Sequence, residues 1–414
     1  MNSTQAGIHF KFFHFILALL CVFLLFINNA QAQKFEFTNG RKQQSISFEL
    51  IKNLIIIPIY INEKGPFNFI LDTGVSPMII TDPALRESLK INYPRPIKIS
   101  GYGNFEGIDA YLTSLGVKIG DAEIGNMPSV FLKEDLLNLS GFVGKKIYGL
   151  IGYNFFNSFV VKINYSNKII KYSLPEKKVS IKGEKIPLTF IENKPYIHLG
   201  LEQEGFKHQT IKALVDCGAT HTLSLESWQS LAFPKPAITI DANLGVGLTG
   251  EIKGRMGRAS KLTIGSVSLK DVITSYPEYV LDSLQNKDRN ANIGAEILSR
   301  FNIVYDYQNG YMYLKKNDAF NRPFEHDMAG IEIYSEQGPP SRYMIARIEK
   351  ESPAQQVGLQ EGDEITGINF KKIDTYNLDE IGAIFKAKNG YSVLIEIWRN
   401  NSYLIKLLKL KKRI

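Results

Sequence analysis

Two stretches of this chain repeat one pattern, FNFILDTGVSPMIIT at residues 67–81 and QTIKALVDCGATHTLSL at residues 209–225. Each begins as an apolar run that ends in an aspartate, Asp72 or Asp216, and continues with a small residue, a glycine and a second apolar run. Short apolar runs separated by glycine turns are typical of β-strands. The recurrence of the whole pattern indicates that the chain contains an internal duplication.

Further landmarks follow both aspartates in register. Gly101-Tyr102-Gly103 follows Asp72 at the same spacing at which Gly245-Val246-Gly247 follows Asp216. Farther along, Leu150-Ile151-Gly152 and Asn292-Ile293-Gly294 come at nearly equal spacings from their respective aspartates. The duplicated unit therefore extends far beyond the two aspartate motifs, and its short alternating segments predict an all-β fold.

The composition fits a chain of several globular domains. With 414 residues, of which 44% are apolar and 22% charged, the chain is too long for one small core and too mixed for a disordered or polytopic membrane protein. We predict a mainly β protein with two duplicated lobes, residues 42–180 and 181–316. Residues 328–414 predict a separate, smaller α+β module, in the order strand, strand, short helix, strand, longer helix, strand, strand.

The N-terminus has the pattern of a secretory signal. Lys11 precedes an apolar run over residues 12–27, and Ala30-Gln31-Ala32 offers the small residues that a signal peptidase recognises. We expect residues 1–32 to be removed near Ala32 and the protein to be exported to the periplasm or the cell exterior. The alternative is an uncleaved segment that anchors the protein to the membrane. Cleavage would leave Cys217 as the sole cysteine, so no intramolecular disulfide is expected.

The two aspartates are candidates for acid–base chemistry. A carboxylate at the end of an apolar strand is costly to bury unless it is neutralised or hydrogen-bonded. If the duplication brings Asp72 and Asp216 together, both cannot ionise easily, and the pair shares one proton. One carboxylate can then accept a proton from water while the other donates one to a carbonyl oxygen, as in the aspartic proteases that serve as the standard example of such a pair.

The motifs resemble those of a retropepsin-like or pepsin-like aspartic protease with two lobes. The resemblance rests on Leu71-Asp72-Thr73-Gly74, Val215-Asp216-Cys217-Gly218 and the two later motifs that end in glycine, and it covers about residues 42–316. It implies acid-protease β-barrel lobes that each supply one catalytic aspartate, with Thr73, Gly74, Cys217 and Gly218 supporting the active loops. It also implies two flaps over a peptide substrate, unless these segments are only structural turns. One flap would consist of Gly101, Tyr102 and Gly103, and the other of Gly245, Val246 and Gly247.

The sequence departs from this family in its second motif and after its first. Cys217 replaces the usual threonine or serine, whose hydroxyl braces the two active loops in the family, and a thiol is a weak donor. Val75 and Pro77 occupy positions where serine or alanine is more usual. A second lobe that is retained only as a structural half therefore remains an alternative.

Other patterns do not predict a function. The net charge of +8 is spread along the chain, and the basic run at residues 409–413 is expected to be a solvated tail, so no nucleic-acid partner is predicted. The histidines lack metal-ligand spacing, and no metal or cofactor is expected. Gly245, Gly247 and Gly250 match a dinucleotide fingerprint, but no helical pattern follows them. Cys217 with His221 lacks a visible oxyanion partner for thiol catalysis.

The C-terminal module resembles a PDZ domain of the bacterial type. The resemblance rests on Ala329-Gly330-Ile331, on Ser352-Pro353-Ala354 and on the turns around Gly358 and Gly362. It implies a peptide ligand that adds as a strand beside Ile331 while amides of the preceding loop bind its C-terminal carboxylate. The alternative is a module used only for packing against the lobes.

Together these features predict an exported aspartic endopeptidase with a PDZ module for peptides or partners. Two other functions remain open. One is a non-catalytic exported protein that binds peptides, and the other is a protease active only as a homodimer through Asp72.

Overall fold

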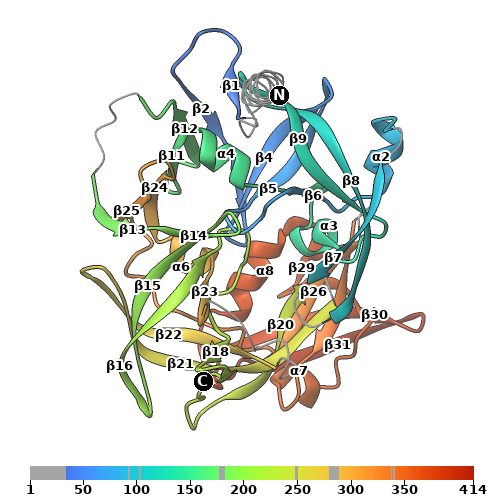
Figure 1. Ribbon diagram of the computed structural model, residues 1–414. Helices are drawn as coiled ribbons and strands as arrows, with labels where there is room; N and C mark the ends of the chain where they lie inside the picture. The colour runs from blue at the N-terminus through green and yellow to red at the C-terminus, as the bar shows by residue number, and fades with distance from the viewer. Residues whose placement is uncertain are drawn as a thin grey trace, which may run out of the picture. The chain divides into compact units, whose positions relative to one another are not determined.

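The computed structural model describes residues 34–91, 94–101, 104–176, 182–247, 250–278, 289–336, 338 and 341–414. The predicted signal segment at residues 1–32 lies outside these residues, as do Tyr102 and Gly103 of the first predicted flap. In the described part of the chain, no helix has both the length and the apolar character that a membrane span needs. Strands dominate the described residues, so the predicted fold class is confirmed (Figure 1).

The first lobe is a nine-stranded sheet that closes on itself, because β8 pairs with β9 as well as with β4 and β7. Its path is β1 (Glu36–Phe37), β9 (Ala122–Leu132), β6 (Met78–Ile80), β10 (Gly149–Ile151), β5 (Lys64–Leu71), β4 (Leu54–Ile61), β8 (Asn104–Ile119) and β7 (Arg95–Gly101), with β3 (Glu49–Ile51) beside β4. Three short helices accompany it, α2 (Ala84–Ser88), α3 (Leu139–Val143) and α4 (Tyr153–Ser158).

The second lobe repeats this arrangement with eight strands, and β15 closes it onto β21. Its path is β14 (Thr189–Ile191), β15 (Lys194–Gln203), β16 (Phe206–Val215), β23 (Ala291–Ile293), β17 (Leu223–Leu225), β22 (Val267–Pro277), β21 (Gly250–Ile264) and β20 (Ile240–Gly247). The short pair β18 (Ser227–Trp228) and β19 (Leu231–Ala232) and the helix α6 (Ala295–Leu298) complete the lobe.

The two copies place their aspartates in the same way. Strand β5 pairs in parallel with β10, and β16 pairs in parallel with β23, so that each aspartate follows a strand held on one side by the later apolar motif. The amide of Asp72 donates to the carbonyl of Ile151 at 2.9 Å, and the amide of Asp216 donates to the carbonyl of Ile293 at 3.0 Å. The registered landmarks of the sequence are therefore the strands that hold the two active loops.

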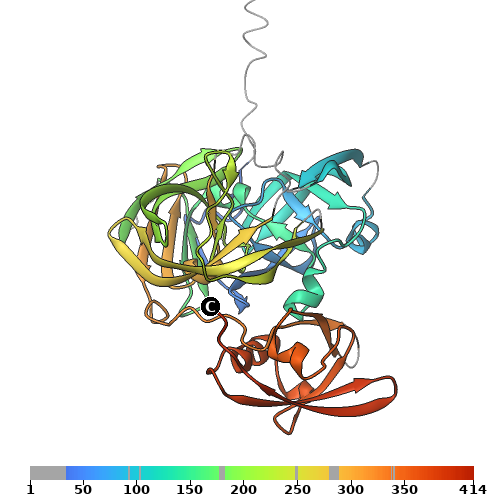
Figure 2. The same cartoon turned by 90° about the horizontal axis from the view of Figure 1, so that it is seen from below.

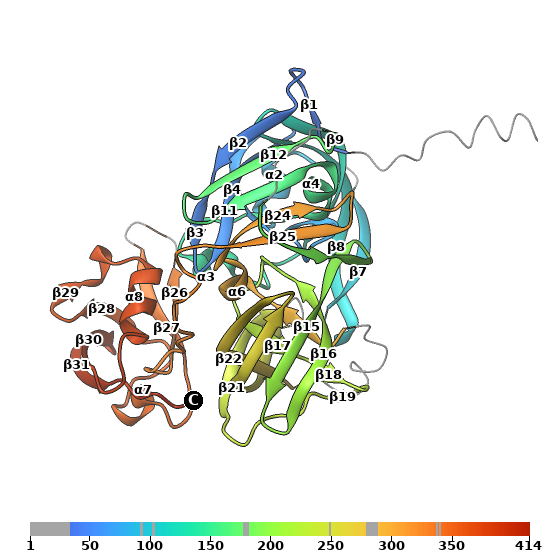
Figure 3. The same ribbon diagram turned by 90° about the vertical axis from the view of Figure 1, so that its left-hand side faces the viewer.

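A six-stranded sheet joins the lobes (Figure 3). Its order is β13 (Glu184–Pro187), β25 (Tyr311–Lys316), β24 (Phe301–Asp306), β11 (Val160–Asn164), β12 (Ile169–Ser173) and β2 (Gln43–Ser47). The junction is the antiparallel pair β11–β24, in which Ile163 faces Ile303. Buried aromatic side chains from both lobes pack beside it, including Phe156 of lobe 1 and Tyr305 of lobe 2 at 5.1 Å between ring centres. One apolar core therefore runs through both lobes.

The C-terminal module, orange to red in Figure 2, has the predicted elements in order, with a short strand and a 3-10 turn added before the longer helix. Its sheet runs β26 (Ile331–Glu336), β27 (Arg342–Ile348), β28 (Glu364–Ile368), β30 (Ser392–Arg399) and β31 (Ser402–Lys409), with β29 (Lys371–Lys372) beside β28. The helices are α7 (Pro353–Gln356), the 3-10 turn η1 (Ile373–Thr375) and α8 (Leu378–Phe385). Helix α8 begins with a reciprocal capping box between Asn377 and Glu380 and buries its apolar face in a core of the module's own.

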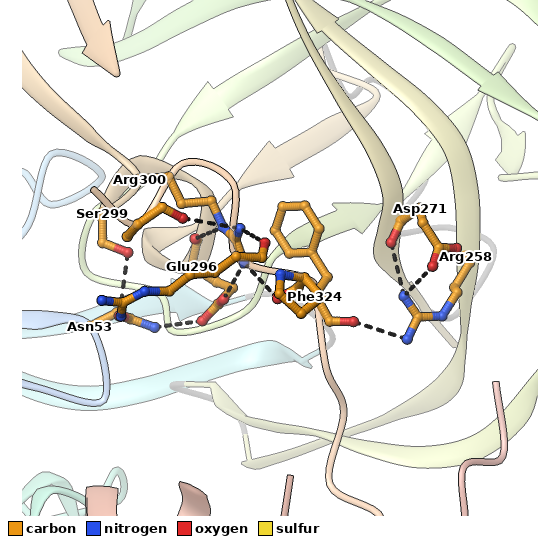
Figure 4. A network of polar contacts seen from close by, with 10 residues as sticks. Asn53, Arg258, Asp271, Glu296, Ser299, Arg300 and Phe324 are labelled. Carbon is orange, nitrogen blue, oxygen red and sulfur yellow. Dashed lines mark hydrogen bonds and ion pairs between the residues drawn. The ribbon is translucent and has the colours of Figure 1, made fainter. Parts of the chain in front are cut away.

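The connector after β25 is held against lobe 2 by two arginines (Figure 4). Arg300, whose side chain is only 4% exposed, pairs with Glu296 and donates to the carbonyls of Arg322 and Pro323. Its guanidinium also lies 3.6 Å from the ring centre of Phe324. Arg258 donates to the carbonyl of Phe324 at 3.0 Å. The joint between lobe 2 and the module is therefore ordered through polar contacts.

The basic C-terminal run is only partly the solvated tail that the sequence predicts: Lys409, Lys411 and Lys412 are exposed, but its other residues contact the protein. Leu410 is buried, and the side chain of Arg413 is only 7% exposed because it pairs with Glu349. The amide of Arg413 donates to His326 at 3.2 Å, so the end of the chain contacts the start of the module. The local charge pattern alone gave the wrong expectation for Arg413, because a long side chain can bury its stem and still reach a carboxylate.

Two truncated chains test whether the connector stabilises the two lobes. A chain that ends at Asp327 keeps the carbonyl partners of Arg258 and Arg300, and its protease lobes are expected to stay within about 1 kcal/mol of the parent's stability. A chain that ends at Asp318 lacks the connector carbonyls to which Arg300 donates, and it exposes apolar surface. Its unfolding free energy should be lower than the parent's by about 3 kcal/mol or more. Urea unfolding of both chains measures the difference, and equal stabilities would contradict the anchoring role of Arg300.

Candidate active site

The carboxylates of Asp72 and Asp216 meet between the lobes. The amide of Gly74 donates to Asp72 at 2.6 Å, and that of Gly218 donates to Asp216 at 3.0 Å, so each loop curls around its own aspartate. A Cβ atom on Gly218 would overlap Cγ of Asp72, and one on Gly74 would lie 3.2 Å from Cγ of Asp216. Each loop thus touches the carboxylate of the other lobe, and Gly218 leaves room for Asp72 because it has no side chain.

Thr73 and Cys217 brace the two loops against each other. The hydroxyl of Thr73 donates to the carbonyl of Val215 at 2.7 Å and accepts from the amide of Cys217 at 3.0 Å. The thiol of Cys217 donates to the carbonyl of Leu71 at 3.2 Å and accepts from the amide of Thr73 at 3.4 Å. The bracing network is therefore complete, with sulfur in the place of one hydroxyl oxygen.

The surroundings of Asp72 favour its protonated form. Burial raises the pKa of Asp72 well above its usual value, and the nearby charge of Asp216 and a side-chain hydrogen bond with it raise this pKa further. The amide of Gly74 opposes the shift because it stabilises the ionised form. Asp72 therefore holds its proton to higher pH than a separated, exposed carboxyl would.

Asn292 is a polar neighbour of the pair that the sequence analysis did not single out. Its side-chain amide donates to Oδ2 of Asp216 at 2.9 Å. It stands at the position that Leu150 occupies in the first lobe, since Leu150 pairs with Ile70 and Asn292 with Leu214 in the two parallel ladders. A polar residue in one copy of an otherwise apolar repeated motif was the signal that could have identified it.

The local chemistry contradicts a thiol nucleophile. Burial is the first cause that raises the pKa of the Cys217 thiol, so the thiolate that nucleophilic attack requires is disfavoured. Burial also lowers the pKa of His221, whose Nε2 lies 3.2 Å from the backbone oxygen of Asn292. Among the described residues, no three His, Cys, Asp or Glu side chains are grouped as metal ligands would be.

A cavity of about 1760 Å³ opens over the two aspartates. Its walls include Gly245, Val246 and Gly247, which lie at the end of the β20–β21 hairpin, and the Val246 side chain is 44% exposed. Gly101 ends β7 at the matching hairpin of lobe 1, where it faces Asn104 across the strand pair. The second predicted flap therefore borders the cavity, whereas Tyr102 and Gly103 of the first lie outside the described residues.

A carboxylate of the same chain accepts hydrogen bonds from the predicted peptide-binding loop of the module. The amides of Ala329 and Gly330 both donate to the carboxylate of Asp327. Burial raises the pKa of Asp327 to about 6. Ile331 begins β26, which is an edge strand of the module's sheet, and it lines the same cavity together with residues of α8 such as Ile381. Helix α3 of lobe 1 contacts β26, and Gly144 at its end lies beside Leu378 of α8 and Ser335 of β26. A peptide added as a strand here would have to displace this contact, and its carboxylate would compete with Asp327 for the loop amides.

Family models match two segments of the chain. Residues 57–155 match the family model for an aspartyl protease, and residues 344–399 match that for a PDZ domain. Part of lobe 1 is thus similar to an aspartyl protease, and most of the C-terminal module is similar to a PDZ domain.

Curated relatives include a "Probable CtpA-like serine protease" of Staphylococcus haemolyticus, 23% identical over 46% of this chain and 37% of the relative. Another is the "Carboxy-terminal processing protease CtpA" of Bacillus subtilis, 24% identical over 39% of this chain and 35% of the relative. The chain spans little more than a third of either relative's length.

Two solved structures of aspartic proteases are also similar. The aspartic proteinase from Irpex lacteus is 11% identical with a TM-score of 0.38, over 68% of this chain and 99% of that one. A retropepsin-like aspartic protease from Rickettsia conorii is 19% identical with a TM-score of 0.24, over 34% of this chain and 96% of that one.

The raised pKa of Asp72 predicts a pH-dependent gain in stability for Asp72→Asn. The unfolded chain releases the Asp72 proton near pH 4, whereas the folded protein holds it to higher pH, so the parent loses stability as the pH rises between these points. The variant has no such loss. We expect its melting temperature to match the parent's below about pH 4 and to exceed it at pH 7. A gain that is the same at both pH values would show that ionisation is not the cause.

The bracing network predicts that Cys217→Thr is tolerated. Thr73 shows that a hydroxyl fits the equivalent place in lobe 1, and a hydroxyl donates a stronger hydrogen bond than a thiol. Urea unfolding is expected to show a gain on the order of 1 kcal/mol. Cys217→Ala, which removes the donor, serves as the control and should be less stable than the parent. A Cys217→Thr protein less stable than Cys217→Ala would contradict the bracing role.

Proposed function

We propose that this protein is an aspartic endopeptidase in which Asp72 and Asp216 of a single chain act on one water, and in which the PDZ domain binds peptides or partner proteins. The approach of the two carboxyls, one from each lobe, beneath a cavity large enough for a peptide carries the proposal. The aspartyl protease and PDZ matches support it. Because both carboxyls come from one chain, this geometry supports a single-chain pair over a homodimer active through Asp72.

The two carboxyls can carry out hydrolysis with balanced proton transfers. The ionised carboxylate takes a proton from water as the water oxygen bonds to the scissile carbonyl carbon, and the protonated carboxyl donates its proton to the carbonyl oxygen. The first carboxyl then gives its new proton to the leaving nitrogen, while the second recovers a proton from a hydroxyl of the intermediate. The peptide C–N bond breaks, and the pair returns to one shared proton.

Substrate and cellular location are part of the same proposal. The cavity is bordered by the β20–β21 hairpin and by apolar residues of the module, a lining that suits an extended peptide better than a small polar metabolite. The pattern of residues 1–32 supports export to the periplasm or the cell exterior, with an uncleaved membrane anchor as the alternative.

Peptide cleavage by the parent and two substituted proteins tests the proposal. Residues 33–414 incubated with a diverse peptide mixture are expected to yield internal cleavages by mass spectrometry, and Asp72→Asn and Asp216→Asn should each reduce the rate by at least about a thousandfold. Asp121→Asn, which changes a partly exposed carboxylate paired with Arg41, serves as the control and should retain the parent's rate.

Each outcome distinguishes the open alternatives. Binding of peptides without cleavage in the parent would favour the non-catalytic peptide-binding protein. Activity that survives Asp216→Asn, and that rises steeply with protein concentration, would favour the homodimer. Loss of activity in both variants with full activity in the control supports the single-chain pair.

A further inference from the structure

The hydrogen bonds around the two aspartates are unequal. Asp216 accepts an N–H from Gly218 at 3.0 Å and a second from the side chain of Asn292 at 2.9 Å. Asp72 accepts the amide of Gly74, but in the part of the chain that the structure describes no side-chain N–H donates to it. The corresponding position in lobe 1 is Leu150, which has no donor. Because N–H donors favour the ionised form of a carboxyl, Asn292 breaks the near symmetry of the pair.

We propose that Asn292 is a positioning residue that assigns the two roles, holding Asp216 as the carboxylate that takes the proton from water and leaving Asp72 as the carboxyl that donates to the substrate carbonyl. The proposal rests on the peptidase function proposed above and specifies that same site. The proposal leaves the proton transfers of the mechanism unchanged, because Asn292 donates a hydrogen bond and transfers no proton.

The loss of stability that a buried asparagine causes at this position supports a functional role for Asn292. Asn292 is only 7% exposed, and its Oδ1 is buried with no partner among the described side chains and backbone. An unpaired buried oxygen lowers stability, and the first lobe fills the same place with leucine. A residue with only a structural purpose would gain nothing from the amide, whereas a residue that holds an ionised carboxylate needs its N–H.

Among the described residues, no other group is poised to assign these roles. The titratable groups that face Asp216 are Asp72, Cys217 and His221 from the two loops and Tyr305 from β24. Burial favours the protonated thiol and phenol and the neutral form of His221, because it raises the pKa of Cys217 and Tyr305 and lowers that of His221. Lys194, a residue of β15, acts on Asp72 and favours its ionised form, which opposes the proposed assignment. The amide of Asn292 must therefore outweigh this charge.

The test compares pH profiles of kcat and kcat/KM for the parent and Asn292→Leu, which copies the residue of lobe 1. Loss of a hydrogen bond to an ionised group should move the acid limb of kcat/KM to higher pH by about one unit and lower kcat roughly tenfold at the parent's optimum. KM should change little, because the hydrogen bond that is lost is made to Asp216 and not to the substrate. Asn292→Gln keeps an N–H donor, and its profile should lie closer to the parent's.

Asn290→Leu provides a matched control for structural damage. Asn290 lies two residues before Asn292, and its side chain accepts from the amide of Lys212 at 2.9 Å and donates to the carbonyl of Ser227 at 3.2 Å, without touching either aspartate. This variant should lose stability and keep the parent's pH profile. Asn292→Leu should show the reverse pattern. Its pH profile should shift, and its resistance to unfolding at acid pH should be at least equal to the parent's.

A readout without catalysis separates this proposal from the function itself. The unfolding free energy of Asn292→Leu relative to the parent should fall as the pH rises through the ionisation of Asp216, because the variant no longer stabilises that charge. A folded Asn292→Leu protein with the parent's pH profile and a pH-independent stability difference overturns the role of Asn292. A parent that cleaves no peptide, yet shows the pH-dependent difference, overturns the peptidase function and leaves the role of Asn292 at Asp216 intact.

Discussion

The contact between two carboxyls, one buried and one partly buried, is the constraint on which the lobes depend. Asp72 and Asp216 repel each other when both are ionised, and the burial of Asp72 reduces the screening by water. The loops that carry them are nevertheless tied together by the hydrogen bonds of Thr73 and Cys217. The retained proton and the loop amides reduce the repulsion. The shared core and the β11–β24 pairing supply the rest of the stabilisation that keeps the pair closed.

Duplication gives the site its two halves, and small departures from symmetry distinguish them. The strand pairs β5–β10 and β16–β23 hold the aspartates alike, but the first active loop has a threonine where the second has a cysteine. Likewise, one apolar motif begins with leucine and the other with asparagine. A symmetric pair could transfer protons in either direction across a substrate. Unequal hydrogen bonding favours one direction because it stabilises one of the two ionisation states.

The module at the C-terminus has its own core, yet it is not loosely attached. Arg258 and Arg300 hold the connector on lobe 2, and Arg413 brings the chain end back to the start of the module. Asp327 stands at this junction and caps the loop that a bound carboxylate would need. A ligand carboxylate at this loop would have to displace Asp327 from the amides of Ala329 and Gly330.

The sequence by itself determined the duplication, the β class, the order of elements in the module and the pair of candidate aspartates. These follow from local patterns that recur in register, and such patterns survive without knowledge of distant contacts. Only the tertiary structure decided that Asn292 contacts Asp216, that the thiol of Cys217 completes the brace, and that Arg413 is buried. These contacts join residues that are far apart along the chain, and their partners depend on strand pairing that no local pattern specifies.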